Sequence, residues 1–259
     1  MNCADRTLAP FGRRLCPVVA HARHGAYDVV SVLDAGPPPQ PGQFYMLTAG
    51  ERWGGGADER PFLPRAFSVL RRHEDGTLDF LFEDVGPGTR RLCELRAGDG
   101  LWLLGPLGVG FRRPEHGRRP LLVGGGVGIA PLAIWQDELG APALLGFRDA
   151  VHAEGAALLR DARVATDDGS VGFHGLVTEL LREEMDSGSV VYACGPPPML
   201  EAVRALSSAE GVPAQLALES GMACGYGACF GCVVPTRSGY VRLCVDGPVL
   251  DAAELELVA

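Results

Sequence analysis

The stretch Cys224-Gly-Tyr-Gly-Ala-Cys229-Phe-Gly-Cys232, together with Cys244, holds four of the eight cysteines of the chain. Their spacing is C-x4-C-x2-C-x11-C, and the first three follow the spacing of loops that hold a plant-type [2Fe–2S] cluster. Gly225, Gly227 and Gly231 permit a tight curl of the backbone and leave amide N–H groups free to point at sulfur atoms. The stretch therefore predicts an iron–sulfur site.

Two other uses of these cysteines stay open at this point. A structural zinc site is one, although zinc sites usually pair their cysteines as two C-x2-C knuckles, and this spacing is not paired that way. A set of disulfides is the other, although no signal peptide is visible at the N-terminus to indicate an oxidising compartment. The spacing favours the iron–sulfur cluster over both.

Composition narrows the class of protein. The chain has 259 residues, 47% hydrophobic and 21% charged, as in an ordinary globular protein of one to three domains. A net charge of −9 argues against a nucleic-acid binder, and the apolar stretches are too interrupted to span a membrane. We therefore expect a cytoplasmic protein without a membrane span or a nucleic-acid partner.

The first hundred or so residues have a β pattern. Short apolar runs are separated by turns rich in glycine and proline, and Asp75-Gly76 is a hairpin-type turn signal. The predicted strand regions lie at residues 16–33, 43–48, 67–70, 78–82 and 101–104. Many short strands of this kind predict a small antiparallel β-barrel.

The pattern changes after a charged, proline-containing bridge at residues 112–119. Strands and helices then alternate, which predicts a parallel sheet with helices on both faces. The strands are expected at residues 120–123, 143–147, 163–166, 190–194 and 215–219, and the helices at 129–139, 156–161, 176–184 and 199–209. Such sheets bind ligands outside the carboxyl ends of their strands.

Two turns are expected at that ligand-binding edge. Gly124-Gly-Gly-Val-Gly128 lies between a strand and a helix, where glycines let the backbone approach a phosphate and the helix N-terminus favours its charge. Ala193-Cys-Gly-Pro-Pro-Pro-Met199 follows a later strand. Each alone could be a plain strand-to-helix turn, the second with proline near the helix start. Together they favour a nucleotide site that includes Gly124, Gly125, Gly126, Gly128 and Gly195.

Two segments of the barrel carry groups suited to a flavin. In Arg65-Ala-Phe-Ser68, the arginine can pair with a phosphate, the phenylalanine can pack on the ring system, and the serine can hydrogen-bond a ring nitrogen. Alone, this segment could equally be an ordinary edge strand. Gly86-Pro-Gly-Thr89 could hold a pyrophosphate on its amides, or could simply be a turn in which Thr89 caps a following helix.

The order of these motifs resembles the ferredoxin–NADP reductase superfamily. More closely, it resembles the family of dihydroorotate dehydrogenase B electron-transfer subunits, over about residues 16 to 250. The most specific segments are Glu219 through Cys232, Tyr240 through Pro248, and Thr166 through Gly175. The resemblance implies an antiparallel β-barrel FAD domain at 1–112, an α/β Rossmann-like NAD domain at 113–215, and a small C-terminal [2Fe–2S] domain at 216–259.

The resemblance also implies roles for individual residues. The predicted flavin contacts are Arg65, Ala66, Phe67, Ser68, Leu81, Phe82, Glu83, Gly88 and Thr89, and the predicted cluster ligands are Cys224, Cys229, Cys232 and Cys244. One departure concerns Glu83. The family often has arginine at this position, and an acid cannot pair with a phosphate, so the role of the Glu83 side chain stays open.

The implied chemistry is an electron relay in which the cofactors do the redox work. An FMN-containing dihydroorotate dehydrogenase catalytic subunit would oxidise dihydroorotate, in pyrimidine (UMP) biosynthesis. Electrons would pass through [2Fe–2S] and FAD to NAD+, in a complex expected to be a heterotetramer. This scheme requires no catalytic acid or base from the chain.

Other hypotheses remain. The chain could be the electron-input subunit of another redox complex, of sulfhydrogenase or glutamate-synthase type, or an NAD(P)H-dependent, ferredoxin reductase-like protein; these share every cofactor. A non-enzymatic zinc-bound interaction module would instead be colourless. For the nucleotide we expect NAD rather than NADP, because Asp167 and Asp168 follow the third strand and would repel a 2′-phosphate, although Arg148 follows the preceding strand.

Overall fold

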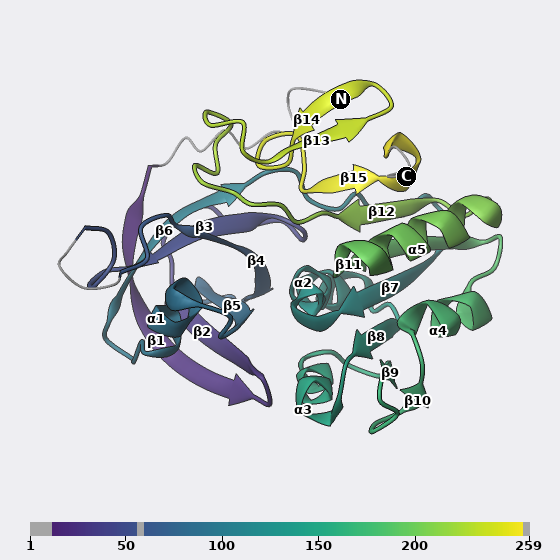
Figure 1. The fold of residues 1–259 in the computed structure, drawn as a ribbon, viewed down its shortest axis with the longest axis horizontal. Helices are drawn as coiled ribbons and strands as arrows, with labels where there is room; N and C mark the ends of the chain where they lie inside the picture. Colours follow the sequence, from purple (N-terminus) through teal and green to yellow (C-terminus); the bar gives the residue numbers. More distant parts are fainter. Residues whose placement is uncertain (1–11, 56–59, 256–259) are drawn as a thin grey trace.

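The computed structural model describes residues 12–55 and 60–255 (Figure 1). Residues 1–11 and 56–59 of the predicted barrel domain, and 256–259 of the predicted cluster domain, lie outside the described residues. Among the described residues, no helix is both long enough and apolar enough to cross a lipid bilayer.

The N-terminal part is a closed barrel of six antiparallel strands, as the sequence predicts. Its strands are β1 (Arg14–His24), β2 (Tyr27–Leu33), β3 (Phe44–Ala49), β4 (Arg65–Arg72), β5 (Thr77–Glu83) and β6 (Gly100–Leu107). Their order around the barrel is β1-β2-β5-β4-β3-β6, and β1 closes it by pairing with β6. The β4–β5 turn is the predicted one, with Gly76 at φ 89°, a conformation that glycine adopts without strain. The interior is apolar, with Tyr45 and Phe80 in edge-to-face contact.

The second part is a sheet of seven strands in the order β10-β9-β8-β7-β11-β12-β15. Its strands are β7 (Arg119–Gly125), β8 (Ala143–Phe147), β9 (Ala162–Thr166), β10 (Phe173–His174), β11 (Ser189–Cys194), β12 (Ala214–Ala217) and β15 (Val249–Asp251). All neighbouring pairs are parallel except β12 and β15. The central strands are apolar along their length because helices cover both of their faces.

The helices divide between the two faces of this sheet (Figure 1). They are α2 (Ala130–Leu139), α3 (Ala150–Ala153), α4 (Val177–Glu184) and α5 (Pro197–Ala209), while α1 (Pro87–Cys93) belongs to the barrel. On β7, Leu121 and Val123 share an apolar core with α4 and α5, whereas Leu122 between them packs with α2 and α3. This alternation along a strand confirms the predicted α/β layering.

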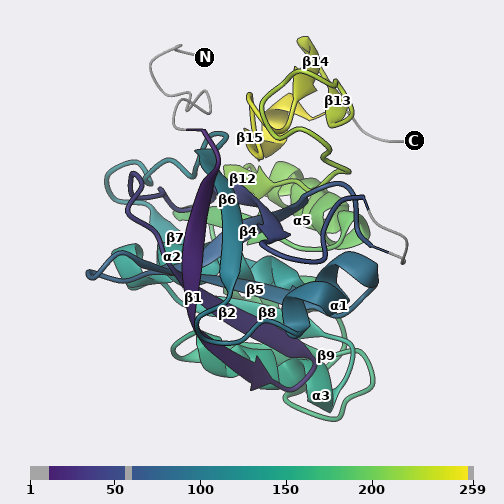
Figure 2. The same ribbon diagram turned by 90° about the vertical axis from the view of Figure 1, so that its left-hand side faces the viewer.

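The C-terminal part joins the other two. Its hairpin of β13 (Val233–Thr236) and β14 (Gly239–Arg242) lies beside β15, which adds an antiparallel strand to the α/β sheet (Figures 1 and 2). The cysteine-rich loop reaches the barrel instead, since a side chain at Gly225 would collide with Met46 of β3 and contact Leu107 of β6. The cluster segment therefore packs against both larger parts.

Two local predictions are wrong. The helix expected at 156–161 is replaced by α3 and a 3-10 helix at Glu154–Leu158, because Asp149 caps an earlier start by accepting the His152 N–H at 3.0 Å. The apolar run from Tyr240 to Val245 has the residue pattern of a strand that returns to the cysteine-rich loop, but the strand ends at Arg242. A turn follows, in which the Asp246 N–H donates to the Arg242 carbonyl at 2.8 Å, and Cys244 lies in that turn.

Candidate functional site

A cavity of about 220 Å³ lies between the barrel and the α/β sheet. The barrel wall consists of Phe44 of β3 and of residues from β4, β5, the turn before α1 and the first turn of α1. Of the predicted flavin contacts, Ala66, Phe67, Ser68, Leu81, Phe82, Glu83 and Thr89 line it. The opposite wall includes Val127, Glu219 and Met222, from the Gly-rich turn and the segment that precedes the cysteines. The structure thus brings most of the predicted flavin residues to one cavity, lined by aromatic and aliphatic side chains.

Arg65 and Gly88 meet beside this cavity. A Cβ atom added to Gly88 would lie 2.5 Å from Nε of Arg65, so the guanidinium rests on the turn at a place where only glycine fits. The Arg65 Nη1 donates to the Leu63 carbonyl at 2.6 Å, which fixes the side chain over the turn. An arginine held against a glycine turn fits the pyrophosphate of a flavin dinucleotide.

Thr89 supports the turn rather than standing free. Its Oγ1 accepts the N–H groups of Val85 at 2.9 Å and Gly86 at 3.1 Å. The helix cap is Gly86, and Thr89 lies in the first turn of α1, so the alternative of Thr89 as the cap is wrong. Its hydroxyl is already engaged and holds the backbone of the turn in place.

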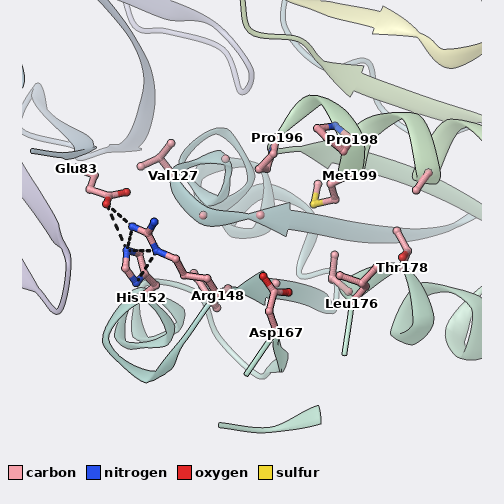
Figure 3. Close-up of a pocket in the computed structure, with 18 of the residues that line it drawn as sticks. Glu83, Val127, Arg148, His152, Asp167, Leu176, Thr178, Pro196, Pro198 and Met199 are labelled. Atoms are coloured by element: carbon pink, nitrogen blue, oxygen red, sulfur yellow. Dashed lines mark hydrogen bonds and ion pairs between the residues drawn. The ribbon is translucent and has the colours of Figure 1, made fainter. Parts of the chain in front are cut away.

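A larger cleft of about 520 Å³ opens at the carboxyl edge of the sheet (Figure 3). Gly125, Gly126, Gly128 and Gly195, four of the residues predicted for the nucleotide site, line it. Glycine is required here because the two turns touch: a Cβ on Gly128 would collide with the Cys194 carbonyl. The cleft therefore has the bare backbone and the helix N-terminus that a dinucleotide phosphate needs.

Gly124 has a packing role instead. It is not among the residues that line the cleft, and a Cβ there would lie 3.1 Å from Ile129, Leu132 and Leu145. A side chain at this position would separate α2 from the sheet. Gly124, the first glycine of the turn, thus lets α2 pack closely on the sheet, whereas Gly125, Gly126 and Gly128 face the cleft.

Asp167 and Asp168 separate in the structure. Asp167 lines the cleft, whereas the Asp168 carboxylate accepts the N–H of Ser170 at 2.9 Å and its hydroxyl at 2.6 Å. These bonds lower the pKa of Asp168 and turn its charge toward the β9–β10 loop. Only one of the two predicted acids therefore faces the nucleotide cleft.

Glu83 extends from the end of β5 across to the α/β sheet (Figure 3). Its Oε1 lies 2.7 Å from Nη2 of Arg148 and 3.3 Å from Nε2 of His152. The His152 Nδ1 lies 2.7 Å from Asp149, and its Nε2 contacts the Arg148 guanidinium. The Glu83 side chain thus holds a cation of the nucleotide cleft.

No disulfide joins Cys224, Cys229, Cys232 or Cys244 to another cysteine in the part of the chain that the structure describes. Cys224 interacts with the side chain of Cys229, and Cys244 with that of Cys232. Within residues 12–55 and 60–255, no three His, Cys, Asp or Glu side chains are gathered to hold a single metal ion. Two thiol pairs are the donor set that a two-iron cluster uses, because each iron takes two protein ligands.

The surroundings of the thiols differ. Burial raises the pKa of the Cys224 thiol, but the N–H groups of Cys229 and Tyr226 and the Cys229 thiol outweigh it and lower that pKa to about 7. Burial, with the Cys232 thiol, raises the pKa of Cys244 to about 12. The Gly231 N–H points at the Cys229 Sγ from 3.4 Å, so an amide of the loop faces sulfur as predicted.

Among the lining residues that carry no role in the sequence predictions, Glu219 and Tyr27 stand at the ligand-facing ends of their strands. Glu219 lines both the flavin-side cavity and the nucleotide cleft, and burial raises the pKa of its carboxyl. Its place just after β12 was a usable signal, since that strand ends at the ligand edge. Tyr27, at the start of β2, also lines the cleft, and nothing in the sequence places a barrel residue there.

A barrel followed by this sheet defines the class of ferredoxin–NADP reductase-like proteins. A structure of an NADH-dependent reduced ferredoxin-NADP oxidoreductase aligns with a TM-score of 0.77 and 26% identity, over 95% of this chain and 91% of that one. A ferredoxin NADP+ reductase from Neisseria gonorrhoeae aligns with a TM-score of 0.63 and 17% identity, over 77% of this chain and 92% of that one, and shows the fold alone.

Residues 219–256 match the family model for the iron-sulfur cluster binding domain of dihydroorotate dehydrogenase B. The dihydroorotate dehydrogenase B (NAD(+)) electron transfer subunit of Caldanaerobacter subterraneus subsp. tengcongensis is 40% identical over 85% of this chain and 88% of its own. The corresponding subunit of Geobacillus thermodenitrificans is 39% identical over 84% of this chain and 87% of its own. The chain belongs to the family of dihydroorotate dehydrogenase B electron transfer subunits.

Proposed function

We propose that the chain passes electrons from a dihydroorotate dehydrogenase catalytic subunit, through a [2Fe–2S] cluster and FAD, to NAD+. The observation that carries this proposal is the continuity of the three candidate sites. Glu83, Val127 and Glu219 line both the flavin-side cavity and the nucleotide cleft. Met222 lines the flavin-side cavity, only two residues before Cys224. Cluster, flavin and nicotinamide would therefore be neighbours.

The residues of the chain bind and orient in this scheme. Arg65 and Gly88 would hold the flavin pyrophosphate, with Thr89 supporting the turn. Strands β4 and β5 would form the walls around the ring system through Ala66, Phe67, Ser68, Leu81, Phe82 and Glu83. Gly125, Gly126, Gly128 and Gly195 would admit the nucleotide, and Gly124 would keep α2 against the sheet.

Cys224, Cys229, Cys232 and Cys244 would ligate the cluster, with amides such as that of Gly231 directed at sulfur. When bound, FAD would supply the conversion between single electrons and a hydride, which neither the cluster nor the nicotinamide can make. The chain itself would position these groups relative to one another.

The partner and the setting complete the proposal. The catalytic partner would be an FMN-containing dihydroorotate dehydrogenase subunit in a heterotetramer, in cytoplasmic UMP biosynthesis. The domain limits would be 1–112 for FAD, 113–215 for NAD and 216–259 for the cluster, with β12 crossing the second boundary and β15 of the cluster segment completing the α/β sheet. The relatives named above support this assignment, since each is an electron transfer subunit of dihydroorotate dehydrogenase B.

A second candidate is an electron-input role in another redox complex. The alignment with the NADH-dependent reduced ferredoxin-NADP oxidoreductase favours it, because that match spans 95% of this chain. Both candidates share the cofactors and differ in the partner that exchanges electrons with the cluster.

The first test is an anaerobic visible spectrum of the purified chain before and after NADH. Flavin and iron–sulfur absorbance that bleach together would support the relay. A folded, cofactor-loaded protein without iron–sulfur absorbance would contradict it.

The second test adds dihydroorotate with and without the catalytic subunit. Reduction only in the presence of that subunit would establish the partner. Reduction by reduced ferredoxin, and none by the catalytic subunit, would favour the second candidate.

A further inference from the structure

The hydroxyl group of Tyr27 is buried without a hydrogen-bond partner among the described residues. The ring is fully buried, and its Oη makes no hydrogen bond to any described residue. Buried polar groups are almost always paired, because an unpaired group loses its hydrogen bonds to water and gains none within the protein. A tyrosine that only filled space would be replaced at lower cost by phenylalanine, so the hydroxyl requires a specific explanation.

The fold places this hydroxyl at the nucleotide cleft. Tyr27 lies directly opposite Glu83 in the β2–β5 register, so the two project from one end of the barrel. Tyr27 lines the cleft, and a Cβ on Gly126 would be 3.8 Å from its Oη. Gly126 opens the 3-10 helix at Gly126–Ile129, which continues into α2, so its amide end attracts phosphate. The hydroxyl thus stands next to the place where a dinucleotide phosphate is expected.

The ring is held firmly in this position. Gly155 seats one edge, since a Cβ there would lie 2.7 Å from the Tyr27 Cε2. His152 packs edge-on at 5.7 Å, and Phe147 lies at 6.4 Å between ring centroids. A side chain that is already packed on several sides loses little conformational entropy when its hydroxyl donates to a bound acceptor.

The charges around Tyr27 keep it a donor. Burial raises the pKa of the phenol, and the Glu83 carboxylate raises it further, while Arg148 works in the opposite direction and Asp149 adds to the rise. The net direction is upward, so the phenol keeps its proton at neutral pH. A protonated hydroxyl beside a glycine turn can donate to a phosphate oxygen.

We propose that the Tyr27 hydroxyl donates a hydrogen bond to a phosphate oxygen of the nicotinamide dinucleotide at the Gly126 turn. The barrel then binds not only the flavin but also part of the nucleotide, and Tyr27 joins the two domains around the bound ligand. This inference rests on the proposed function, because it takes the cleft to be the dinucleotide site.

The test is calorimetric binding of NAD+ and of ADP to the flavin-loaded, cluster-loaded protein, in wild type and in Tyr27→Phe. A lost hydrogen bond to a charged acceptor predicts affinity for both ligands about tenfold lower or weaker still. The melting temperature of the ligand-free protein should stay the same or rise, because the variant loses no internal hydrogen bond. Tyr45→Phe is the matched control, a fully buried tyrosine of β3 that lines neither cavity, and it should bind NAD+ as wild type does.

The outcomes are distinct. Affinities within twofold of wild type in Tyr27→Phe would overturn this inference and leave the proposed function standing. A marked fall in the melting temperature of ligand-free Tyr27→Phe would also overturn it, because the hydroxyl would then have an internal partner. Wild-type protein that binds neither NAD+ nor ADP would overturn the proposed function, and the inference with it.

Discussion

Glu83 of the barrel and Arg148 of the α/β sheet form an ion pair, with 2.7 Å between the carboxylate Oε1 and the guanidinium Nη2 (Figure 3). Both residues line the nucleotide cleft. Arg148 directly follows β8, about where dinucleotide-binding folds place the group that reads the adenine ribose. The ion pair therefore neutralises the positive charge of Arg148, which would otherwise attract the 2′-phosphate of NADP.

Replacing Glu83 should relax the nucleotide preference. In Glu83→Gln, Arg148 loses its carboxylate partner, and the negative charge that would repel a 2′-phosphate is removed. We expect the ratio of NAD+ affinity to NADP+ affinity to fall about fivefold, the size of effect of one partly exposed ion pair. The measurement is the dissociation constant of each nucleotide, in protein matched for FAD content because Glu83 also lines the flavin-side cavity.

Asp168→Asn is the matched control for that experiment. It removes one negative charge from the same edge of the sheet, but the Asp168 carboxylate is engaged by Ser170 and does not line the cleft. Its nucleotide preference should match that of wild type. An equal fall in the ratio in both variants would attribute the effect to net charge and not to the Glu83–Arg148 pair.

The cluster ligands can be tested without a partner. Cys229→Ser should lose the iron, the acid-labile sulfide and the reduced-state electron paramagnetic resonance signal, because a cluster held by four cysteines loses one iron ligand. Cys93→Ser is the control: Cys93 lies outside the loop, and its thiol bonds Asp28 at 3.4 Å, a bond that serine can keep. Metal analysis that finds zinc and no sulfide in the wild type would support the alternative of a zinc site.

Local sequence pattern predicts helices, strands and turn motifs of this protein. Periodicity places α2 within one residue of its observed start and β8 at its observed limits, and the turn Asp75-Gly76 is recognisable from residue type alone. These features depend on neighbouring residues, so local pattern suffices to predict them. The grouping of flavin residues from β4 and β5 also follows, because adjacent strands of a barrel share a wall.

The features that sequence reasoning missed depend on distant contacts. Glu83 and Arg148 are 65 residues apart, and only the packing of the barrel on the sheet makes them partners. Strand β15 is a three-residue segment, Val249-Leu-Asp251, that is too short for any periodicity to indicate its pairing with β12. Asp167 and Asp168 look equivalent in the chain, and a hydrogen bond from Ser170 decides which one faces the cleft.

The barrel should lose stability in acid through Asp34. Burial would raise the pKa of this carboxyl, but the Arg14 guanidinium at 2.7 Å and the Gly36 N–H at 3.0 Å outweigh burial and hold the pKa below its usual value. A carboxyl with a depressed folded-state pKa stabilises the fold above its unfolded pKa of about 4 and loses that contribution as the pH falls further.

Asp34→Asn tests this assignment. It leaves the buried end of Arg14 without its counter-charge, so we expect about 3 kcal/mol less free energy of unfolding at pH 7. Between pH 5 and pH 3 the variant should also lose less stability than wild type, because it lacks the group that titrates. Denaturant unfolding at several pH values gives both quantities, and parallel pH profiles for the two proteins would refute the role of Asp34.

Phe230 should be part of the surface through which the cluster meets its partner. It lies between two predicted cluster ligands, its side chain is 63% exposed, and Arg242 stacks over its ring at 5.3 Å. Its φ of 56° is a left-handed conformation that aspartate tolerates well, so Phe230→Asp should keep the loop folded. We expect this variant to exchange electrons with the catalytic subunit about tenfold more slowly, because a charge replaces an apolar contact, while NADH-to-dye activity stays near wild type.

Val19→Asp, which adds the same charge at a 42% exposed position on β1, should leave both rates unchanged. Equal loss of both activities in Phe230→Asp would mean that the substitution damages the cluster itself, and normal partner reduction would place the docking surface elsewhere.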